Sequence, residues 1–302
     1  MASTLTLDQL RVLVTISEAG SFSAAGRKLR RAQSAISQTV HTLEDAQGVQ
    51  LFDRSGRTPK LTTAGLVLLA EARRVVHQSQ MFESVARGIA AGIEPEFALA
   101  LDSVMPTEPI VESLRGLQRA FPDLLVTLFT ETRDASLRRV RNRSAALAIC
   151  AMFPAVEQDL LTMPLLSVAL TPVAAASHPL AQVPRPIPRD LLQDHVQLIL
   201  TDPFDSSGPS FGVISPRIWR FADMGRRLEF LLAGFGWARL PLHLAAPYLA
   251  DGRLRDLQFD DPTLRPISVP IFAVHERDRP PGKAMRWFLD SLRVEVGKTA
   301  GR

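Results

Sequence analysis

One polar segment, residues 33–43, constrains this sequence more than any other stretch. Apolar residues recur along it at positions i, i+4 and i+7, as on one face of a helix: Ile36, Val40 and Leu43. The other face carries side chains that suit the base edges and phosphate oxygens of nucleic acid: Gln33, Ser34, Ser37, Gln38 and His41. The pattern predicts an amphipathic helix with one face for packing and the other for hydrogen bonding.

The residues just upstream complete a helix-turn-helix pattern. Ser23 is placed to cap a short helix over residues 24–29, and Arg30 and Arg31 then turn the chain toward the next helix. In that order the second helix is the one that enters the major groove of DNA. We therefore add Ser23, Arg30 and Arg31 to the DNA-binding candidates. A small helical subdomain with a solvated polar face is the alternative that this pattern alone leaves open.

A basic turn follows the two helices. Residues 51–52 are apolar and anchor a hairpin-like turn over residues 53–60, in which Gly56 permits a tight bend. Cations stand on both sides of that glycine: Arg54, Arg57 and Lys60. Such a wing would lie on phosphates or in a minor groove, so Arg54 and Arg57 join the DNA-binding candidates.

With the wing included, the N-terminal region resembles the LysR-type transcriptional regulators. The matching positions are residues 10–13, 20–25, 29, 33–37, 43–44, 48–52, 54, 57 and 61–65. Ala32 departs from the family, which usually has Ser or Thr there to cap the recognition helix. The missing cap should cost about 1 kcal/mol of helix stability. The resemblance implies a regulator that binds double-stranded DNA, with RNA polymerase as a possible further partner.

Bulk properties are those of an ordinary globular protein. The chain has 302 residues, enough for two or three compact units, with 46% apolar and 22% charged residues. A net charge of +4 permits nucleic-acid binding without establishing it. Cys150 is the only cysteine, which excludes an intramolecular disulfide and a cysteine-rich metal site. Without a secretion signal or an apolar run of about 20 residues, we expect a soluble cytoplasmic protein with no membrane partner.

A long helix is predicted after the wing, from a cap at Thr62 or Thr63 to about Gly88. Apolar residues recur along it every seven positions, at Leu68, Val75, Phe82 and Ile89, with small residues at Ala72, Ser79 and Ala86. A seven-residue seam is typical of two helices that pack along one another, so we expect a homodimer. The alternative is that the stripe packs on the core of its own chain. The resemblance implies a linker helix that pairs protomers, and a dimer or tetramer.

Beyond a break at Gly88, Gly92 and Pro95 the pattern changes to α/β. Short apolar runs typical of buried parallel strands occupy residues 97–101, 124–129, 145–151, 168–176 and 196–200. Helical segments alternate with them at residues 107–120, 135–142, 224–233, 242–250 and 282–294.

Residues 160–164 should cross into a second lobe and residues 267–274 should return to the first, which creates a cleft between the lobes. The two Rossmann-like lobes resemble the effector domain of LysR-type regulators and the periplasmic binding proteins; residues 232–241 match that family's glycine-rich helix end, strand and proline. We expect a winged helix-turn-helix domain over residues 1–61, a linker helix over 62–92 and an effector domain over 93–302. In the last, lobe one spans about 96–164 and 267–302, and lobe two about 165–266.

Residues at strand ends are the candidates for binding an effector in that cleft: Ser103, Val104, Met105, Thr132, Cys150, Thr201, Asp202 and Met224. The resemblance favours Ser103, Thr132 and Thr201 as direct contacts. The alternative is that each hydroxyl simply caps a helix, and that Cys150 fills the core. Because helix N-termini favour anions, we expect a small polar or anionic co-inducer and no cofactor.

The rival functions are those of an enzyme and of an exported solute-binding protein. Residues 208–212 match the G-x-S-x-G turn of hydrolases, but their surroundings read as a loop rather than a strand and a helix. The glycines at 234 and 236 lack the third glycine of a dinucleotide fingerprint, and the six histidines show no metal-ligand spacing. An exported solute-binding protein would have no use for residues 1–92. We therefore predict a regulator without enzymatic activity.

Overall fold

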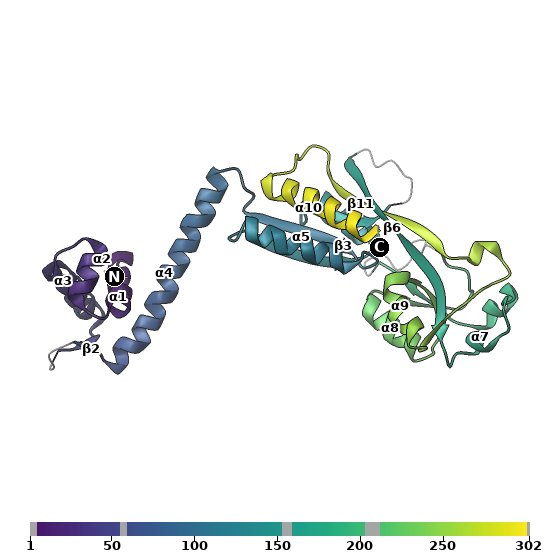
Figure 1. Ribbon diagram of the computed structural model, residues 1–302, viewed down its shortest axis with the longest axis horizontal. Coiled ribbons are helices and arrows are strands. Elements are labelled where there is room, and N and C mark those ends of the chain that lie inside the picture. The colour runs from purple at the N-terminus through teal and green to yellow at the C-terminus, as the bar shows by residue number, and fades with distance from the viewer. Residues whose placement is uncertain (1–4, 55–58, 153–158, 203–211, 301–302) are drawn as a thin grey trace. The chain divides into compact units, whose positions relative to one another are not determined.

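The computed structural model describes residues 5–54, 59–152, 159–202 and 212–300 (Figure 1). Contacts divide the chain into two compact units, Met1–Ala91 and Gly92–Arg302, each with its own core. None of the helices in the described ranges combines the length and the apolar character that a membrane span requires.

Three helices form the body of the N-terminal unit: α1 (Leu7–Ala19), α2 (Phe22–Leu29) and α3 (Gln33–Gln47). The apolar stripe predicted for α3 is buried as expected, with Ile36, Val40 and Leu43 exposed by no more than 2%. They pack against apolar residues of α1, chiefly Leu10, Val12, Leu13 and Ile16. Thr6 caps α1 through a reciprocal capping box with Gln9, which fixes where the first helix begins.

Helix α2 begins two residues earlier than the sequence predicted. Its cap is Ser21, whose side chain accepts a hydrogen bond from the Ala24 amide at 3.1 Å. The predicted cap, Ser23, lies inside the helix, where its hydroxyl accepts a hydrogen bond from Arg27 at 3.0 Å. The earlier start brings Phe22 into the helix and buries its ring, which stacks edge-on against Phe52 at 5.0 Å. The burial of Phe22 within the helix therefore favours Ser21 as the cap over Ser23, two residues further along.

The wing is a short antiparallel pair, β1 (Phe52–Asp53) and β2 (Lys60–Leu61). Glu44 near the end of α3 holds it: one carboxylate oxygen accepts from the Leu51 and Phe52 amides at 2.8 and 3.1 Å. The other oxygen accepts from Arg54 at 3.0 Å. A buried carboxylate thus ties the start of the wing to the helix that precedes it.

Helix α4 (Thr63–Ala90) starts at Thr62, whose hydroxyl accepts from the Gly65 amide at 2.9 Å. Its N-terminal half packs against α1 through Leu69, Ala72 and Val76. Ala72 belonged to the predicted intermolecular seam, so at this position the alternative of packing on the same chain is the correct one. The larger seam residues further along remain exposed: Val75 by 48%, Phe82 by 76% and Ile89 by 53%.

One nine-stranded mixed sheet runs through the C-terminal unit, in the order β4-β3-β5-β11-β6-β9-β7-β8, with β10 paired to β6. The first lobe holds three parallel strands: β3 (Glu96–Asp102), β4 (Leu125–Glu131) and β5 (Leu147–Ala151). The second lobe holds four: β7 (Gln197–Leu200), β8 (Ile218–Phe221), β9 (Trp237–Pro241) and β10 (Leu254–Asp256). The antiparallel pair β6 (Leu160–Ala175) and β11 (Ile267–Glu276) passes through both lobes, as the predicted crossings require.

Two details of the sheet differ from the sequence prediction. The crossing predicted at residues 160–164 and the strand predicted at residues 168–176 form one continuous strand, β6, which pairs antiparallel with β9 and β11, so the sheet is mixed and not purely parallel. Strand β4 is the edge strand of the sheet and is not buried on both faces. Its side chains Leu125, Val126 and Leu128 are 64%, 43% and 48% exposed. An apolar run indicates a strand without saying whether a neighbour covers it.

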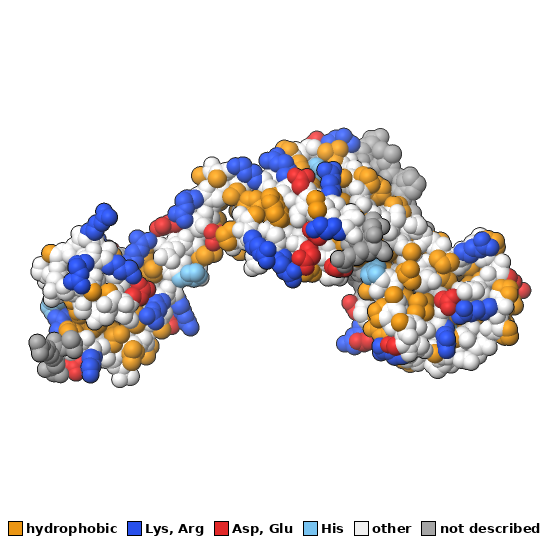
Figure 2. All heavy atoms as spheres, in the orientation of Figure 1, with side chains coloured by type: hydrophobic (Ala, Val, Ile, Leu, Met, Phe, Trp, Pro, Cys, Tyr) orange, Lys and Arg blue, Asp and Glu red, His pale blue; other side chains and the backbone are white. Residues whose placement is uncertain are grey.

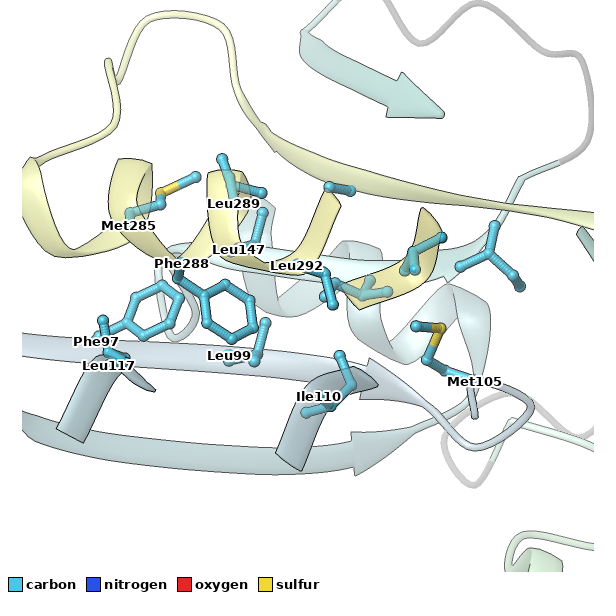
Figure 3. Packing of buried hydrophobic residues seen from close by; sticks show 14 of the residues in the cluster. Phe97, Leu99, Met105, Ile110, Leu117, Leu147, Met285, Phe288, Leu289 and Leu292 are labelled. Atoms are coloured by element: carbon cyan, nitrogen blue, oxygen red, sulfur yellow. The ribbon is translucent and has the colours of Figure 1, made fainter. Parts of the chain in front are cut away.

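Helices flank the sheet: α5 (Thr107–Ala120), α6 (Arg133–Arg141), α7 (Pro179–Gln182), α8 (Met224–Leu232), α9 (Leu242–Ala250) and α10 (Lys283–Ala300), with short 3-10 turns at Arg189–Asp194 and Pro262–Leu264. Figure 3 shows the main core, where Phe97 of β3 meets Phe288 of α10 with ring centroids 5.2 Å apart. Leu117 of α5 closes the same cluster. This rigid layer holds the carboxyl ends of β3 and β5 in place, and those ends carry the site described next.

Candidate functional site

Helix α3 presents the predicted polar face to solvent. Gln33, Ser34, Gln38 and His41 are exposed and Ser37 is half-buried. Its first turn has no side-chain cap, because Ala32 occupies the N-cap position. The uncapped amide groups of that turn are therefore open to an external acceptor such as a phosphate oxygen.

The predicted DNA-binding arginines differ in how they are held. Arg31 makes two hydrogen bonds to Asp8, at 2.7 and 2.9 Å, and these bonds hold the pKa of the Asp8 carboxyl below its usual value. Arg54 is held by Glu44, whereas Arg30 ends α2 in the left-handed conformation at φ 55°. Arg57 lies outside the described residues. On the face of the N-terminal unit seen in Figure 2, lysine and arginine side chains lie among acidic ones.

A cavity of about 760 Å³ lies in the C-terminal unit, a volume typical of small-molecule sites. The first lobe lines it with the ends of β3 and β5 and the start of α6; the second lines it with β7, α8 and β9. Apolar residues such as Val104, Leu170 and Val269 share its wall with charged ones. It occupies the place between the lobes where the sequence predicted an effector cleft.

Asp102 at the end of β3 is a buried carboxylate in this wall. One oxygen accepts from the Val104 amide at 3.1 Å and the other from the Ala151 amide at 3.2 Å. Burial raises the pKa of Asp102 to about 6, against the lowering effect of those two amides. At neutral pH the group is mostly ionised and acts as a hydrogen-bond acceptor.

An ion pair joins the two lobes beside the cavity. Arg138 of α6 donates from Nη2 to Oδ1 of Asp202, which follows β7, at 2.8 Å, and its Nη1 lies 2.7 Å from Oδ2. The Asp202 side chain is only 6% exposed, and the bond to Asp202 raises the pKa of Arg138. A bound anion near Arg138 would compete with Asp202, so this contact can respond to a ligand.

The structure brings most of the predicted effector residues together. The cavity wall contains Val104, Thr132, Thr201, Asp202 and Met224. Thr132 sits at the N-cap of α6 but makes no capping bond, and its hydroxyl is buried without a partner among the described residues. For Thr132, the alternative of an ordinary helix cap is therefore wrong, and its hydroxyl remains available to a ligand.

Three predicted effector residues lie elsewhere. Cys150 is fully buried among Leu137 and Val140, because alternate residues of β5 face opposite sides of the sheet and Ala151 takes the cavity side. Burial raises the pKa of the Cys150 thiol far above its usual value. Met105 packs into the core beneath α10, and Ser103 is not in the cavity wall. In this structure, therefore, these three residues do not line the cavity.

Of the charged residues that line the cavity, the sequence prediction named only Asp202. Besides Asp102, the wall contains charged or amide side chains at Arg133, Asp134, Arg138, Gln197, Arg227 and Arg239. Two of these residues could have been recognised as unusual from the sequence alone. Arg239 interrupts an apolar strand, and Arg227 lies on the helix packed beside that strand, positions where an isolated charge calls for an explanation. Among the described residues, no group of histidine, cysteine and carboxylate side chains could hold a metal ion.

A helix-turn-helix unit with an exposed polar helix, joined in one chain to an α/β unit with a ligand cavity, defines a ligand-responsive DNA-binding regulator. The sequence matches the family models of the bacterial regulatory helix-turn-helix protein, lysR family, over residues 7–66 and of the LysR substrate binding domain over residues 73–296. The chain belongs to the LysR family of transcriptional regulators, with a DNA-binding domain and an effector-binding domain.

Individual relatives are similar in sequence to this protein over almost the whole chain. HTH-type transcriptional regulator PunR of Escherichia coli K12 is 29% identical over 300 residues, covering 94% of this chain and 91% of PunR. HTH-type transcriptional regulator AceR of Acinetobacter baumannii is 26% identical over 288 residues, covering 95% and 96%. Among solved structures, a mutant of OxyR from Corynebacterium glutamicum has a TM-score of 0.57 at 22% identity, covering 98% of this chain and 94% of that one. CrgA from Neisseria meningitidis has a TM-score of 0.51 at 22% identity, covering 97% and 100%.

Proposed function

We propose that this regulator reads DNA with the polar face of α3 and changes its DNA complex when a small polar or anionic molecule fills the cavity of the C-terminal unit. The observation that carries the proposal is the cavity itself, whose two walls come from different lobes and are joined by Arg138 and Asp202. A ligand that binds two states of the lobes unequally shifts the balance between them.

In this proposal base edges are read by Gln33, Ser34, Ser37, Gln38 and His41, and phosphates are contacted by Ser23, Arg30, Arg31, Arg54 and Arg57. The described members of both sets lie on the N-terminal unit and are exposed or half-exposed. The protein would act in the cytoplasm, where its DNA is, and without enzymatic activity; RNA polymerase would be a further partner.

The experiment is a gel-shift titration of the full chain on the DNA upstream of its own gene, with nonspecific competitor and at several salt concentrations. We expect a discrete complex that survives competitor. The variant Gln38→Ala should lose affinity for that DNA about tenfold or more, whereas Gln47→Ala, an exposed glutamine at the end of the same helix, should bind like the wild type. Failure of the wild type to select any sequence from a broad DNA library would overturn the proposal.

We further propose that α4 pairs two protomers, so that two α3 helices meet two half-sites. The support is the run of exposed apolar residues spaced by seven along α4: Val75, Phe82 and Ile89. Phe82→Glu should shift the protein toward monomer in sedimentation velocity, and Glu83→Gln on the adjacent position should not. An unchanged oligomer in Phe82→Glu would remove this face from the interface.

A further inference from the structure

Arg227 of α8 is a buried cation without a carboxylate partner among the described residues. Its side chain lines the cavity, yet the residue is only 6% exposed. The Nε group donates to the Leu198 carbonyl at 3.0 Å and Nη2 donates to the Arg239 carbonyl at 2.8 Å. Nη1 has only the weak acceptor Met224 Sδ, at 3.8 Å. Within the described part of the chain, both Nη1 hydrogens and one on Nη2 are therefore left without a strong acceptor.

Desolvation makes this arrangement costly for the protein alone. Burial lowers the pKa of Arg227 to about 10, so the guanidinium keeps its charge at neutral pH while it has lost most of its water. Carbonyl dipoles compensate for only part of that loss. A buried cation is ordinarily paired with an anion, and here the open donors line a cavity that a small molecule can enter.

A second arginine of the same lobe lines the cavity, and its backbone carbonyl accepts one of the Arg227 hydrogen bonds. Arg239 of β9 is partly buried and also lines the cavity, and burial lowers its pKa. Its Nη2 donates to the Thr263 carbonyl at 2.7 Å, but its buried Nε has no hydrogen-bond partner among the described residues. Two arginines of the same lobe thus line one cavity, each with donors that have no strong acceptor among the described residues.

The other charges of the cavity do not neutralise these two. Arg133 pairs with Asp134, and Arg138 pairs with Asp202. Asp102 remains as a single carboxylate in the first lobe, bound by two backbone amides. Against it stand both arginines of the second lobe, so the wall keeps an excess of one positive charge, which favours an anionic group.

We propose that Arg227 and Arg239 form an anion subsite of the cavity, which takes a carboxylate or phosphate group of the effector. The planar guanidinium groups match the paired oxygens of either group. The subsite rests on the proposed effector function and deepens it, since it names the chemical class of the ligand and the lobe that holds its charge. A purely structural role for Arg227, tying β7 to β9 through two carbonyls, would leave the open donors of both arginines without a use.

The test is thermal unfolding and calorimetric titration of the full chain with succinate, inorganic phosphate and the neutral probe succinamide, at constant ionic strength. We expect at least one anion to raise the Tm saturably while succinamide does not. A response to succinate alone would assign the subsite to carboxylates, and a response to phosphate alone to phosphate groups. Arg227→Met and Arg239→Met should each weaken the binding of that anion about tenfold or more.

The matched control is Arg226→Met, at the position just before Arg227 on α8. The side chain of Arg226 is 72% exposed and pairs with Glu229. It should keep the wild-type anion response. If Arg227→Met does not fold, Arg239→Met and the charge-preserving Arg227→Lys decide the matter. No response to either anion, an equal response to succinamide, or a wild-type response in Arg239→Met would overturn the subsite.

DNA binding of the same preparations separates the two proposals. A protein that selects its DNA sequence but shows no anion response has lost only the subsite. A protein that binds the anion through Arg227 and Arg239 but selects no DNA sequence keeps the subsite and counts against the proposed function.

Discussion

The polar side chains of α3 are exposed to water, whereas Asp102 and Arg227 of the cavity have lost most of their contact with it. Gln38 and His41 can turn toward a DNA base at little cost because solvent satisfies them until contact. Asp102 and Arg227 are already held by backbone groups and have few alternative positions. The first surface suits a partner that is recognised by many small contacts, and the second suits a ligand that replaces lost water with a few strong ones.

The largest expected effect tests whether Asp102 is as desolvated as its raised pKa indicates. The pKa of Asp102 rises from its ordinary 3.8 to about 6 in the folded protein. Ionisation therefore favours the unfolded chain, and the contribution of Asp102 to the free energy of unfolding falls by up to about 3 kcal/mol as pH rises from 4 through 6. The difference in free energy of unfolding between the wild type and Asp102→Asn, measured by urea titration at several pH values, should show this fall.

Taking that difference removes other titrations. Burial lowers the pKa of His178 to about 4, so its contribution is lost as pH falls below 6.5, with the opposite sign to that of Asp102. Because His178 is present in both proteins, its effect cancels. A difference that does not change between pH 4 and 7 would mean that Asp102 is solvated, and the contrast with α3 would weaken.

The next effect concerns the ion pair between the lobes. Arg138→Ala leaves Asp202 buried without its guanidinium partner and should lower the free energy of unfolding by about 2 kcal/mol. Arg141→Ala is the matched control on the same helix, because its pair with Asp159 is exposed and should contribute less than about 1 kcal/mol. Equal losses in urea titration would show that the cavity pair is no better shielded than a surface pair.

The wing offers a smaller effect on the DNA side of the comparison. Arg54→Ala should weaken binding to all DNA sequences and lower the slope of log affinity against log salt by about one. Filter binding at several salt concentrations measures both quantities. A loss confined to one sequence would mean that Arg54 reads a base, and an unchanged slope would mean that Glu44 keeps it from phosphate.

The smallest effect comes from the missing cap of α3. Ala32→Ser should raise the free energy of unfolding by about 1 kcal/mol, since a hydroxyl can then accept from the free amides of the first turn. Thermal unfolding of the full chain measures it, with Ala32→Val as a control that cannot cap. Stabilisation by both residues would assign the effect to something other than a capping bond.

The sequence predicted the regular parts of the molecule well because short-range patterns define them. Helix α5 spans the predicted residues 107–120, and the stripe of Ile36, Val40 and Leu43 is buried as its spacing required. Helix α3 was predicted to end at Leu43 but continues to Gln47. The prediction stopped early because Glu44 is buried by its hydrogen bonds to the wing, which the apolar spacing of the helix does not reveal.

The sequence predicted where the cavity lies, but not most of the charged side chains that line it. Because Thr132, Thr201 and Asp202 follow predicted strands, the sequence placed them correctly at the edge of the sheet that lines the cavity. Arg227 was missed because its role depends on the Leu198 and Arg239 carbonyls, which approach it from separate strands. Cys150 was misplaced because a one-residue alternation along β5 decides which side of the sheet it faces.

The most direct test of this division is the DNA sequence that each variant selects from a random library. The full-length wild type, Gln38→Ala and Arg138→Ala would be compared under the same salt conditions. We expect Gln38→Ala to change the preferred base at one or two positions of each half-site, and Arg138→Ala to select the wild-type sequence even where its affinity changes. An altered base preference in Arg138→Ala, or an unaltered one in Gln38→Ala, would contradict the separation of DNA reading from ligand binding.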